Sequence, residues 1–398
     1  MERHDVDIFI SGGGIAGLTA AASFGNLGLS VIVADPATPP KSAVSENSDL
    51  RSTAFLEPAQ RLLDEIGLWS SLAAHSTPLE TLRVIDCQGD PPTIRTERAF
   101  QSADLGAPAF GWNLPNWLTR NLHTKQLAKN KNVDLRLGTG FHALLTRERE
   151  AIVTLTDNSQ VRARLAIAAD GRQSPLRDAA SIRPKITRYG QKALAFVVAH
   201  DIAHSNISTE LYLSGGAFTV VPLPDQNGDP ASAVVWMSDG PDATRLLKLS
   251  DEEFNAAATE RSCGVLGQLH LISPRRMWPV VTQRAERLIS ERTAIIAEAA
   301  HVLPPIGAQG LNTSLSDIAA LRDLASDRPQ DIGTPGFLAE YARVRERDIR
   351  LRAGVIDLYN RVCRSNDPPV QSLRSLGLRI AHDVTPLRHS IMRAGLGG

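Results

Sequence analysis

A glycine-rich turn near the N-terminus constrains the fold of this chain more than any other feature. The apolar run 6–11 leads into Gly12-Gly13-Gly14, a helix-compatible stretch follows over 16–27, and 29–34 is a second β-branched run. Strand, glycine turn, helix and strand in this order predict a βαβ unit, the starting element of a Rossmann-type α/β domain.

The three glycines of that unit have the spacing of a dinucleotide-binding turn. Gly12 allows a tight turn, Gly14 lets the backbone approach a pyrophosphate, and Gly17 lets the helix pack closely on the strand. Asp35 stands 18 residues after Gly17, at the end of the second strand, where a carboxylate accepts hydrogen bonds from a ribose. The alternative is a glycine-rich turn without a ligand. The residues expected to bind a nucleotide here are Gly12, Gly14, Ile15, Ala16, Gly17 and Asp35.

Composition excludes several classes of protein. The 398 residues include 43 Lys and Arg and 43 Asp and Glu, so no overall positive charge indicates a nucleic-acid partner. Hydrophobic residues make up 42% and charged residues 22%, which is typical of a globular protein. Cys87, Cys263 and Cys363 form no CxxC pair, so the sequence predicts neither a metal site nor a disulfide framework, and it favours a reducing compartment.

No targeting segment is expected. The N-terminus, starting at Met1 and Glu2, leads directly into a strand pattern without a signal-peptide core. The longest apolar runs, such as 193–199, are much shorter than a membrane span. We therefore expect a cytoplasmic protein, with any membrane contact made from the inner surface.

The C-terminal part carries most of the charge asymmetry. Residues 341–398 contain 11 Arg, no Lys and five acidic residues. Such a basic helical tail is a candidate docking surface for anionic lipid or for an acidic partner, and the alternative is a solvated helix face. The arginines proposed to contact lipid are Arg343, Arg345, Arg347, Arg350 and Arg352.

A change of pattern divides the chain. From residue 185 to about 279 the helix-and-strand alternation gives way to β-rich segments, which indicates a sheet domain inserted into the first domain. We expect a nucleotide-binding domain, an inserted β-sheet substrate domain and a helical C-terminal region. Their boundaries are 1–78, 100–184 and 285–336 for the first, 79–99 and 185–284 for the second, and 337–398 for the third.

Four elements in this order resemble the class A FAD-dependent monooxygenases, the para-hydroxybenzoate hydroxylase-like group. They are the glycine turn, Asp49-x-Arg51, Asp170-Gly171 and the segment AEAAHVLPPIGAQGLN over 297–312. The last, with Asp317 and residues 341–350, is most similar to the ubiquinone-biosynthesis hydroxylase branch.

The resemblance implies FAD as the cofactor and assigns further residues to it. Arg51 would lie along the pyrophosphate, and Asp170 and Gly171 near it. Glu298 replaces the aspartate of the family, and this departure puts a longer side chain beside the flavin. The implied set is completed by Gly310, Leu311 and Asn312. No catalytic residue is assigned. The loop residues implied near the flavin ring are Pro305, Gly307, Gln309 and Gly310. His301 either faces the cofactor or is a structural residue whose hydrogen bonds are made within the protein.

The implied reaction is hydroxylation of an aromatic ring. NADH or NADPH would reduce the flavin as a transient co-substrate, and O2 would then form a flavin C4a-hydroperoxide that transfers oxygen to the ring. The segment 218–224 resembles the apolar strand of the substrate cavity, so Val220, Pro222 and Leu223 are candidate wall residues, with core packing as the alternative. An apolar wall suits a polyprenylated phenol or methoxyphenol of ubiquinone biosynthesis.

Other functions stay open at this point. The chain could act on a soluble aromatic compound, or be a flavin reductase or a halogenase of the same fold, although the WxWxIP motif of halogenases is absent. A different class is a non-catalytic scaffold subunit of a biosynthetic complex, which the Glu298 departure keeps open.

Overall fold

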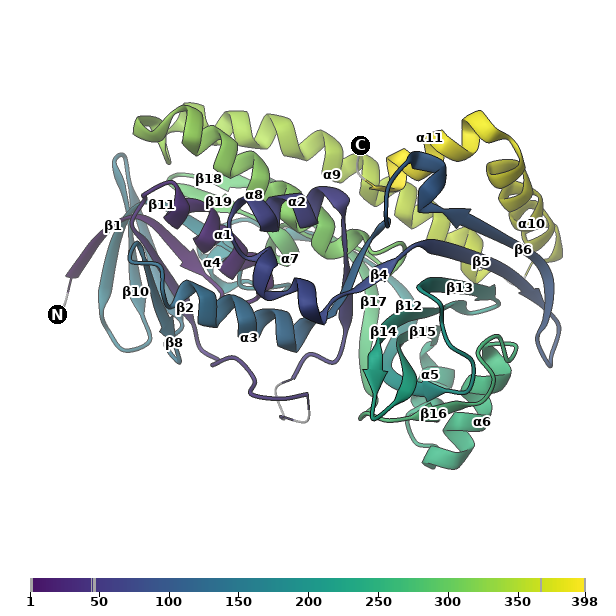
Figure 1. Ribbon diagram of the computed structural model, residues 1–398. Coiled ribbons are helices and arrows are strands. Elements are labelled where there is room, and N and C mark those ends of the chain that lie inside the picture. The colour runs from purple at the N-terminus through teal and green to yellow at the C-terminus, as the bar shows by residue number, and fades with distance from the viewer. Residues whose placement is uncertain (1–2, 44, 46–47, 366, 397–398) are drawn as a thin grey trace.

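Two large sheets lie side by side in the molecule, and one long helix runs along both (Figure 1). The computed structural model describes residues 3–43, 45, 48–365 and 367–396. Met1 and Glu2, discussed above with the N-terminus, lie outside the described residues, as does Gly398 at the end of the basic tail. The predicted α/β class, with a Rossmann-type domain, is confirmed.

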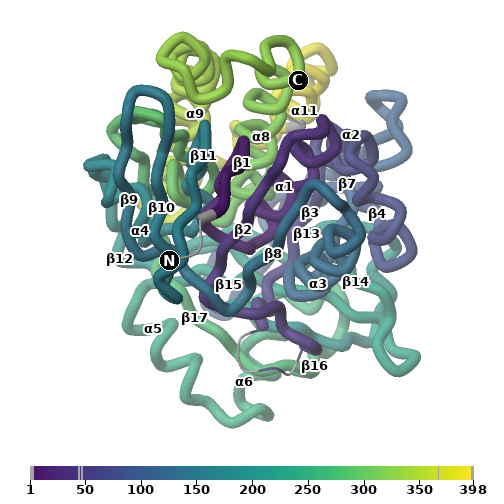
Figure 2. Tube along the Cα trace, turned by 90° about the vertical axis from the view of Figure 1, so that its left-hand side faces the viewer, coloured from purple at the N-terminus to yellow at the C-terminus, as the bar shows by residue number. Residues whose placement is uncertain are grey.

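The first sheet has the strand order β18-β19-β11-β1-β2-β8, in which β19, β11, β1, β2 and β8 are parallel and β18 pairs antiparallel with β19. Ile8, Phe9 and Ile10 of the central strand are completely buried, which explains its unbroken apolar run, because both faces of a parallel sheet are covered. A hairpin, β9 and β10, pairs antiparallel with β11, and Figure 2 shows it beside the sheet, away from α3. The strands are β1 (Arg3–Ser11), β2 (Val31–Asp35), β8 (Val133–Leu137), β9 (Phe141–Arg147), β10 (Glu150–Leu155), β11 (Gln160–Ala168), β18 (Ile289–Ser290) and β19 (Thr293–Ile295).

Helices of this half pack around α1, which follows the glycine turn. Its alanine-rich sequence is buried over nearly its whole length, and small side chains allow α3 and α8 to pack closely against it. The helices are α1 (Ile15–Asn26), α2 (Glu57–Glu65), α3 (Asn116–Leu127), α4 (Pro175–Ala179), α7 (Ala297–Ala300) and α8 (Gln309–Asp327), with short 3-10 turns η1 (Trp69–Ser71), η2 (Ala73–His75), η3 (Ser102–Leu105) and η4 (Pro329–Asp331).

The second sheet is mainly antiparallel, in the order β20-β17-β12-β15-β14-β13-β5-β6, with β16 beside β12. One face packs on α5 and α6 through residues such as Phe218 and Phe254, and the opposite face carries Tyr212 and Met237 toward the C-terminal helices. The elements are β5 (Thr81–Gln88), β6 (Thr93–Gln101), β12 (Pro184–His200), β13 (Ile207–Leu213), β14 (Gly216–Gln226), β15 (Asp229–Asp239), α5 (Gly240–Leu246), α6 (Asp251–Arg261), β16 (Leu269–Leu271), β17 (Arg276–Ala285) and β20 (His301–Val302).

A small third sheet connects the two halves. Its strands, in the order β3-β7-β4, are β3 (Ser52–Leu56), β7 (Gly111–Pro115) and β4 (Thr77–Leu79). Asn113 of β7 donates its Nδ2 hydrogen to the carbonyl oxygen of Pro222 on β14, at 2.8 Å. The small sheet is thereby fixed to the large one.

The C-terminal helices are α9 (Pro335–Arg364), α10 (Pro368–Asp383) and α11 (Thr385–Leu396). Phe337, Tyr341 and Ile349 at the start of α9 belong to the core of the first half, and the predicted domain boundaries stay a prediction. Within the described part of the chain, no helix has the length and apolar character needed to cross a bilayer.

Candidate active site

A cavity of about 660 Å³ lies where the glycine turn, the small sheet and the second sheet meet. Most of the predicted cofactor and loop residues line it, whereas others stand behind the lining and support it. The predicted residues on the cavity surface are Gly14, Ile15, Ala16, Arg51, Gly171, Glu298, His301, Pro305, Gly307, Gln309, Gly310 and Leu311. Those outside the lining are Gly12, Gly17, Asp35, Asp170 and Asn312.

The glycine turn requires glycine for two different reasons. Gly12 has a φ of +111°, and a Cβ there would lie 2.3 Å from the Ala169 carbonyl oxygen, while a Cβ on Gly17 would lie 1.9 Å from the Gly12 carbonyl oxygen. Nothing lies within 4 Å of a Cβ built on Gly14, so its backbone faces open space. No side chain caps the start of α1, which leaves its free N–H groups directed at the cavity, as an anion site requires.

Asp35 braces this turn from below. Its Oδ2 accepts the Gly13 N–H at 2.6 Å and its Oδ1 accepts the Ala37 N–H at 2.7 Å. Arg120, which the sequence analysis did not identify, donates from Nε to the Gly13 carbonyl oxygen at 2.7 Å and also lines the cavity. No local signal marks this arginine, since it comes from α3, far along the chain. The contact of Asp35 with a ribose stays a prediction.

Arg51 lines the cavity and is held by acidic neighbours. Its Nε and Nη2 donate to the two oxygens of Asp49, each at 2.8 Å, and its Nη1 lies 3.8 Å from Oε1 of Glu298. Burial would raise the pKa of Asp49, but the charge and hydrogen bonds of Arg51 and a bond from Asn116 outweigh it, and the pKa is lowered. The pairing with Asp49 therefore orients a guanidinium that faces the cavity.

Asp170 supports the turn that ends β11. It accepts hydrogen bonds from Ser11 Oγ at 2.9 Å, from the Leu176 N–H at 3.1 Å, and from the Ser174 hydroxyl. Burial raises the pKa of this carboxyl. These bonds fix the backbone after β11, and Gly171, at a φ of +84°, reaches the cavity.

The segment from 297 to 301 is anchored on a buried ion pair. Ala297 has a left-handed φ of +54°, and its N–H donates to Oδ2 of Asp317 at 3.0 Å. His301 Nε2 lies 2.7 Å from the same oxygen, and Arg345 Nε donates to Oδ1 at 2.8 Å. Burial would raise the pKa of Asp317, but His301 and Arg345 outweigh it and the pKa is lowered. The contact with Asp317 thus fixes the His301 side chain, which also lines the cavity.

The ion pairs continue along α9 to the other end of the loop. Arg345 and Arg352 both donate to Asp348 at 2.8 Å, and Arg352 Nη1 donates to Oε1 of Gln309 at 3.0 Å. This corrects the expectation that Arg345 and Arg352 face lipid, because the first is buried and the second points inward. Exposed positions for Arg343, Arg347 and Arg350 agree with a surface role.

A second helix N-terminus reaches the cavity at the start of α8. No side chain caps it, and a Cβ on Gly310 would meet nothing within 4 Å. Asn312 donates to the Ala54 carbonyl oxygen at 2.8 Å and accepts the Leu56 N–H at 3.0 Å, which fixes α8 to β3. Asn312 therefore positions the helix end that faces the cavity.

The opposite end of the cavity is apolar, but the predicted wall residues are the wrong ones. Val220 is packed in the core against α5 and α6, Leu223 lies in a small separate cluster, and Pro222 is absent from the lining. Successive side chains of a strand point to opposite faces, so Thr219 and Val221 face the cavity instead. The apolar side chains at this end include Leu82, Phe100, Phe110, Val221, Val235, Leu303, Ile391 and Met392.

Two polar residues at this end were not identified from the sequence. Glu210 of β13 is buried and lines the cavity, and burial raises its pKa although the Gly307 N–H and the Tyr212 hydroxyl both donate to it. Asn113 is completely buried, and its Oδ1 has no hydrogen-bond partner among the described residues. An acidic residue in an otherwise alternating apolar strand is the signal that could have identified Glu210.

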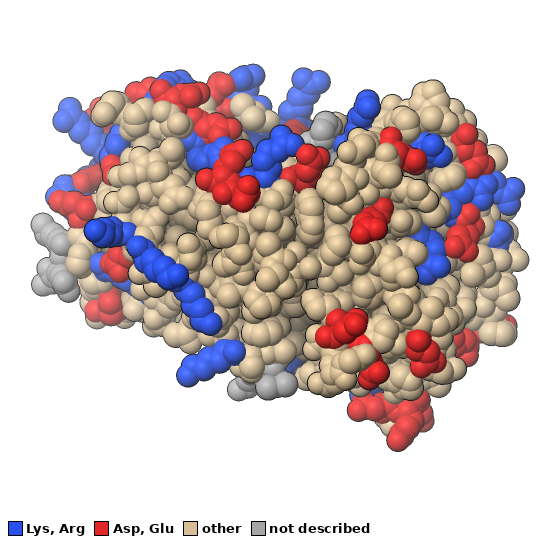
Figure 3. Space-filling view, in the orientation of Figure 1, with Lys and Arg blue, Asp and Glu red and all other residues tan. Residues whose placement is uncertain are grey.

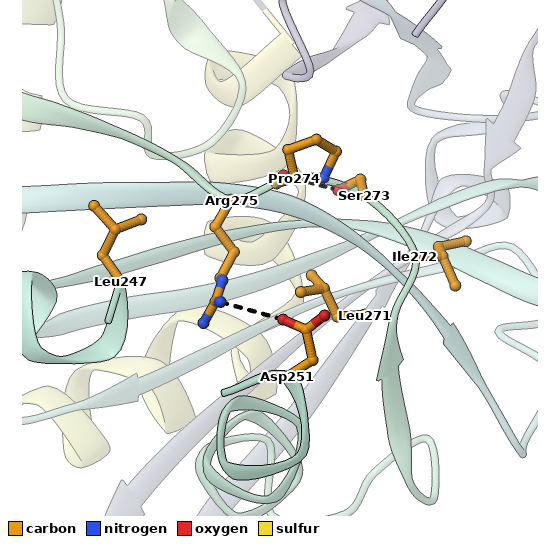
Figure 4. Close-up of a pocket in the computed structure, with 7 residues that line it drawn as sticks. All are labelled: Leu247, Asp251, Leu271, Ile272, Ser273, Pro274 and Arg275. Atoms are coloured by element: carbon orange, nitrogen blue, oxygen red, sulfur yellow. Dashed lines mark hydrogen bonds and ion pairs between the residues drawn. The ribbon is translucent and has the colours of Figure 1, made fainter. Parts of the chain in front are cut away.

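A second, smaller hollow lies beside α6 and the turn before β17 (Figure 4). Its charged residues are already engaged: Arg275 lies 3.2 Å from Asp251 and 4.7 Å above the ring of Phe254. None of the predicted site residues lines it. It is therefore not a candidate active site.

Two uncapped helix N-termini and an oriented arginine around one cavity fit FAD. The start of α1 suits the pyrophosphate, and the start of α8 suits the flavin edge that becomes negative on reduction. Space over Gly14 and Gly310 leaves room for close backbone contact. Fold and site together fit an FAD-dependent enzyme.

Comparison with known proteins gives the family. A model described as an FAD binding domain matches residues 5–347, and the chain belongs to this family, with the class A flavin monooxygenase fold. It is 32% identical over 395 residues to the ubiquinone hydroxylase UbiL of Rhodospirillum rubrum, covering 98% of this chain and 89% of that protein. It is 23% identical to the 3-demethoxyubiquinol 3-hydroxylase of Escherichia coli, over the full length of both.

Solved structures agree on the fold. The p-nitrophenol 4-monooxygenase PnpA of Pseudomonas putida superposes with a TM-score of 0.80 at 18% identity, over 100% of this chain and 99% of that one. The predicted resemblance to class A flavin monooxygenases is confirmed.

Proposed function

We propose that this enzyme uses NADH or NADPH and O2 to hydroxylate the ring of a polyprenylated phenol or methoxyphenol in ubiquinone biosynthesis. Relatives that match almost the whole chain are named for hydroxylation of ubiquinone or its precursors, which supports this pathway. The substrate class is supported by the cavity itself.

The observation that carries the proposal is that two kinds of surface line one cavity. The first half contributes helix N-termini and Arg51, whereas the second sheet and α11 contribute apolar side chains such as Phe100, Val221 and Met392. Burial of a prenyl chain against such side chains stabilises a complex by about 25 cal/mol for each Å² of apolar surface removed from water. A small soluble substrate would not use this surface.

Each part of the chain has a role in such a reaction. Bound FAD supplies hydride acceptance and oxygen activation. The start of α1 and Arg51 would hold the pyrophosphate, and the start of α8 would stabilise negative charge at the flavin edge. Loop residues such as Pro305 and Gly307 line the same cavity, and the apolar wall would exclude water from the reacting ring.

The test is spectroscopic and kinetic. Purified protein is expected to show the visible absorption of bound flavin, and a short-chain prenylphenol is expected to stimulate NADH or NADPH oxidation and yield a hydroxylated product. The control is Glu252→Gln on the outside of α6, where the side chain is exposed. Flavin binding without any stimulation by prenylphenols, but with stimulation by a soluble aromatic acid, would contradict the proposed substrate class.

We also propose that an anionic bilayer is the surface partner of α10 and α11. Leu373, Leu376 and Ile380 are 46–66% exposed, and their spacing places them on one face of α10. Ile391 of α11 is 43% exposed and also lines the cavity, so this apolar surface reaches the substrate end. The arginine excess of the C-terminal residues complements anionic headgroups.

Vesicle sedimentation tests the surface contact. Point substitutions are the suitable test, because removal of the whole C-terminal part would take away α9, which completes the core of the first half. We expect the intact protein to sediment with anionic vesicles, more weakly with zwitterionic ones, and the variant Leu373→Ser, Leu376→Ser, Ile380→Ser to stay in solution. The bilayer would be overturned as partner if the wild type sedimented with neither kind of vesicle. A wild-type dimer that is lost in the triple variant would overturn it as well.

A further inference from the structure

We propose that Cys87 and Cys263 form a reversible oxidation site, at which hydrogen peroxide joins the two thiols in a disulfide that braces the second sheet. Their sulfur atoms lie 3.6 Å apart, although the residues are 176 positions apart in the sequence. Both are free thiols in the structure. Neither residue is among the described residues that line the cavity, so the site goes beyond the proposed hydroxylation and does not depend on its substrate.

Cys87 is enclosed on the face of the second sheet that α6 covers. It is completely buried in a cluster that also contains Ile85 and Phe254. The register of β5 against β6 shifts between Asp86 and Cys87, so the thiol stands at an irregularity near the end of the strand. A thiol buried in this way is closed to reagents in solution, but it can react with a sulfur atom that the fold places beside it.

Cys263 supplies that second sulfur from the end of α6. The Cys263 N–H donates to the Glu260 carbonyl oxygen at 2.9 Å. The next N–H, of Gly264, donates to the Thr259 carbonyl oxygen at 3.1 Å, which completes a Schellman ending of the helix. Glycine is the usual residue at the left-handed position of this motif, and Cys263 occupies it at a φ of +52°. The helix end therefore holds a half-buried cysteine against Cys87 in a conformation that favours glycine.

Arg261 adds a buried positive charge that acts on both thiols. Its Nη2 donates to the carbonyl oxygens of Leu211 and Gly216 at 3.2 and 2.9 Å, whereas its Nη1 is buried without a hydrogen-bond partner among the described residues. Its charge interacts with Cys87 and with Cys263. A cation near a thiol favours the thiolate, which is the form that attacks an oxidant. The guanidinium therefore stabilises the negative charge on sulfur that the reaction needs.

Burial decides which thiol reacts first. Burial and the neighbouring Cys263 raise the pKa of Cys87 to about 12, whereas the charge of Arg261 lowers it and that of Asp86 raises it further. Cys263 is the more exposed of the two residues and meets the peroxide first. Its sulfur attacks one peroxide oxygen and the O–O bond breaks. The products are a sulfenic acid on Cys263 and hydroxide, which takes up the thiol proton and leaves as water.

Cys87 completes the reaction from inside the protein. Its sulfur attacks the sulfenic sulfur, the S–S bond forms and the S–O bond breaks, and the oxygen leaves as a second water with the Cys87 proton. The two thiols are oxidised by two electrons in total, and one hydrogen peroxide is reduced to two waters. The sulfur atoms must approach from 3.6 Å to roughly 2.0 Å. The link then ties the end of β5 to the end of α6.

Mass spectrometry of the FAD-loaded full chain tests the site. After treatment with hydrogen peroxide we expect the intact mass to fall by two hydrogen atoms and a tryptic peptide 84–95 to be linked to 262–275, with both changes reversed by dithiothreitol. Because the link constrains the unfolded chain, the oxidised protein should unfold about 5 °C higher than the reduced protein.

Matched variants assign the roles of the thiols. Cys263→Gly, which suits the left-handed backbone, should lose the link and leave Cys87 as an unmodified thiol. Cys87→Ala should leave Cys263 as a sulfenic acid that a cyclic 1,3-diketone traps. The control Cys363→Ala should keep the link, since Cys363 belongs to a different cluster, together with Tyr212 and Met237.

The site would be overturned if both thiols of the wild type survived peroxide, or if Cys263 gained oxygen without linking to Cys87. A disulfide to Cys363 or between two molecules would overturn it as well. A link that leaves the unfolding temperature unchanged would overturn the bracing of the sheet. If Cys87→Ala does not fold, the peptides of the wild type and of Cys263→Gly still decide the result.

Discussion

His123 makes the FAD-binding half sensitive to acid. It lies in α3, is completely buried, and neither ring nitrogen has a hydrogen-bond partner among the described residues. Burial lowers its pKa from 6.5 to about 3. The unfolded chain therefore binds a proton below pH 6.5 that the folded chain refuses, so stability is highest above pH 6.5 and is lost as the pH falls toward 3.

The size of the effect follows from the two pKa values. Each pH unit between them costs about 1.4 kcal/mol of unfolding free energy, so acidification to about pH 5 costs about 2 kcal/mol through His123 alone. The same helix carries Asn116, Trp117 and Arg120 to the cavity. Loosening of α3 should therefore release FAD together with the loss of stability.

Urea unfolding at about pH 7.5 and about pH 5 measures this contribution. Tryptophan fluorescence reports unfolding and flavin fluorescence reports release of FAD. His123→Leu should lose about 2 kcal/mol less than the wild type on acidification and should be at least as stable at neutral pH, because it removes two unpaired nitrogens. His123→Gln, which is polar but does not titrate, is the control for titration. An equal acid loss in all three proteins would refute the reasoning.

Three further predictions concern the glycine turn, the loop and the thiols. Gly17→Ala should yield protein without flavin, because its Cβ would lie 1.9 Å from a carbonyl oxygen, whereas Gly354→Ala, with open space around it, should retain the visible spectrum. Ala297→Gly should raise the unfolding free energy by about 1 kcal/mol, since a φ of +54° strains alanine and suits glycine. Cys87 and Cys363, whose pKa values burial raises to about 12, should resist thiol reagents near pH 8 until urea is added.

Each of these three predictions would be contradicted by a specific result. A yellow Gly17→Ala protein would mean that α1 can move away from β1 without loss of the cofactor. A less stable Ala297→Gly variant in thermal unfolding would show that the left-handed alanine is not strained, and rapid labelling of the folded protein would show that the thiols are accessible.

The features that could be predicted from the sequence are those that depend on residues close to each other in the chain. The glycine turn, α1 and the two strands around it follow from steric and periodic rules that act within about 30 residues. The face of β14 that meets the cavity could not be predicted by such rules. Successive side chains of a strand point to opposite faces, and both faces of this strand carry apolar residues. Thr219 and Val221 could be assigned only once α5 and α6 were seen to cover the side that carries Val220.

Contacts between distant segments were also beyond local rules. Cys87 and Cys263 are 176 residues apart, yet their sulfur atoms lie 3.6 Å from each other. Arg345 looked like a surface charge until the structure placed it on Asp317, 28 residues away. The uncharged centre of the face in Figure 3, over the junction of the two halves, likewise depends on which strands the fold brings together.

The ion pairs along α9 link two parts of the enzyme that otherwise have separate tasks. Through Asp317 and Gln309 this helix fixes both ends of the loop 297–309, and it is followed by α10 and α11, of which α11 lines the cavity with Ile391, Met392 and Gly395. A displacement of α9 would consequently change cofactor geometry and substrate entry at the same time. In a chimera designed to change substrate range, the segment to exchange is the whole of 335–396 together with its contact residues on α8. If α10 and α11 were exchanged alone, they would follow an α9 whose ion pairs belong to the loop of the original protein.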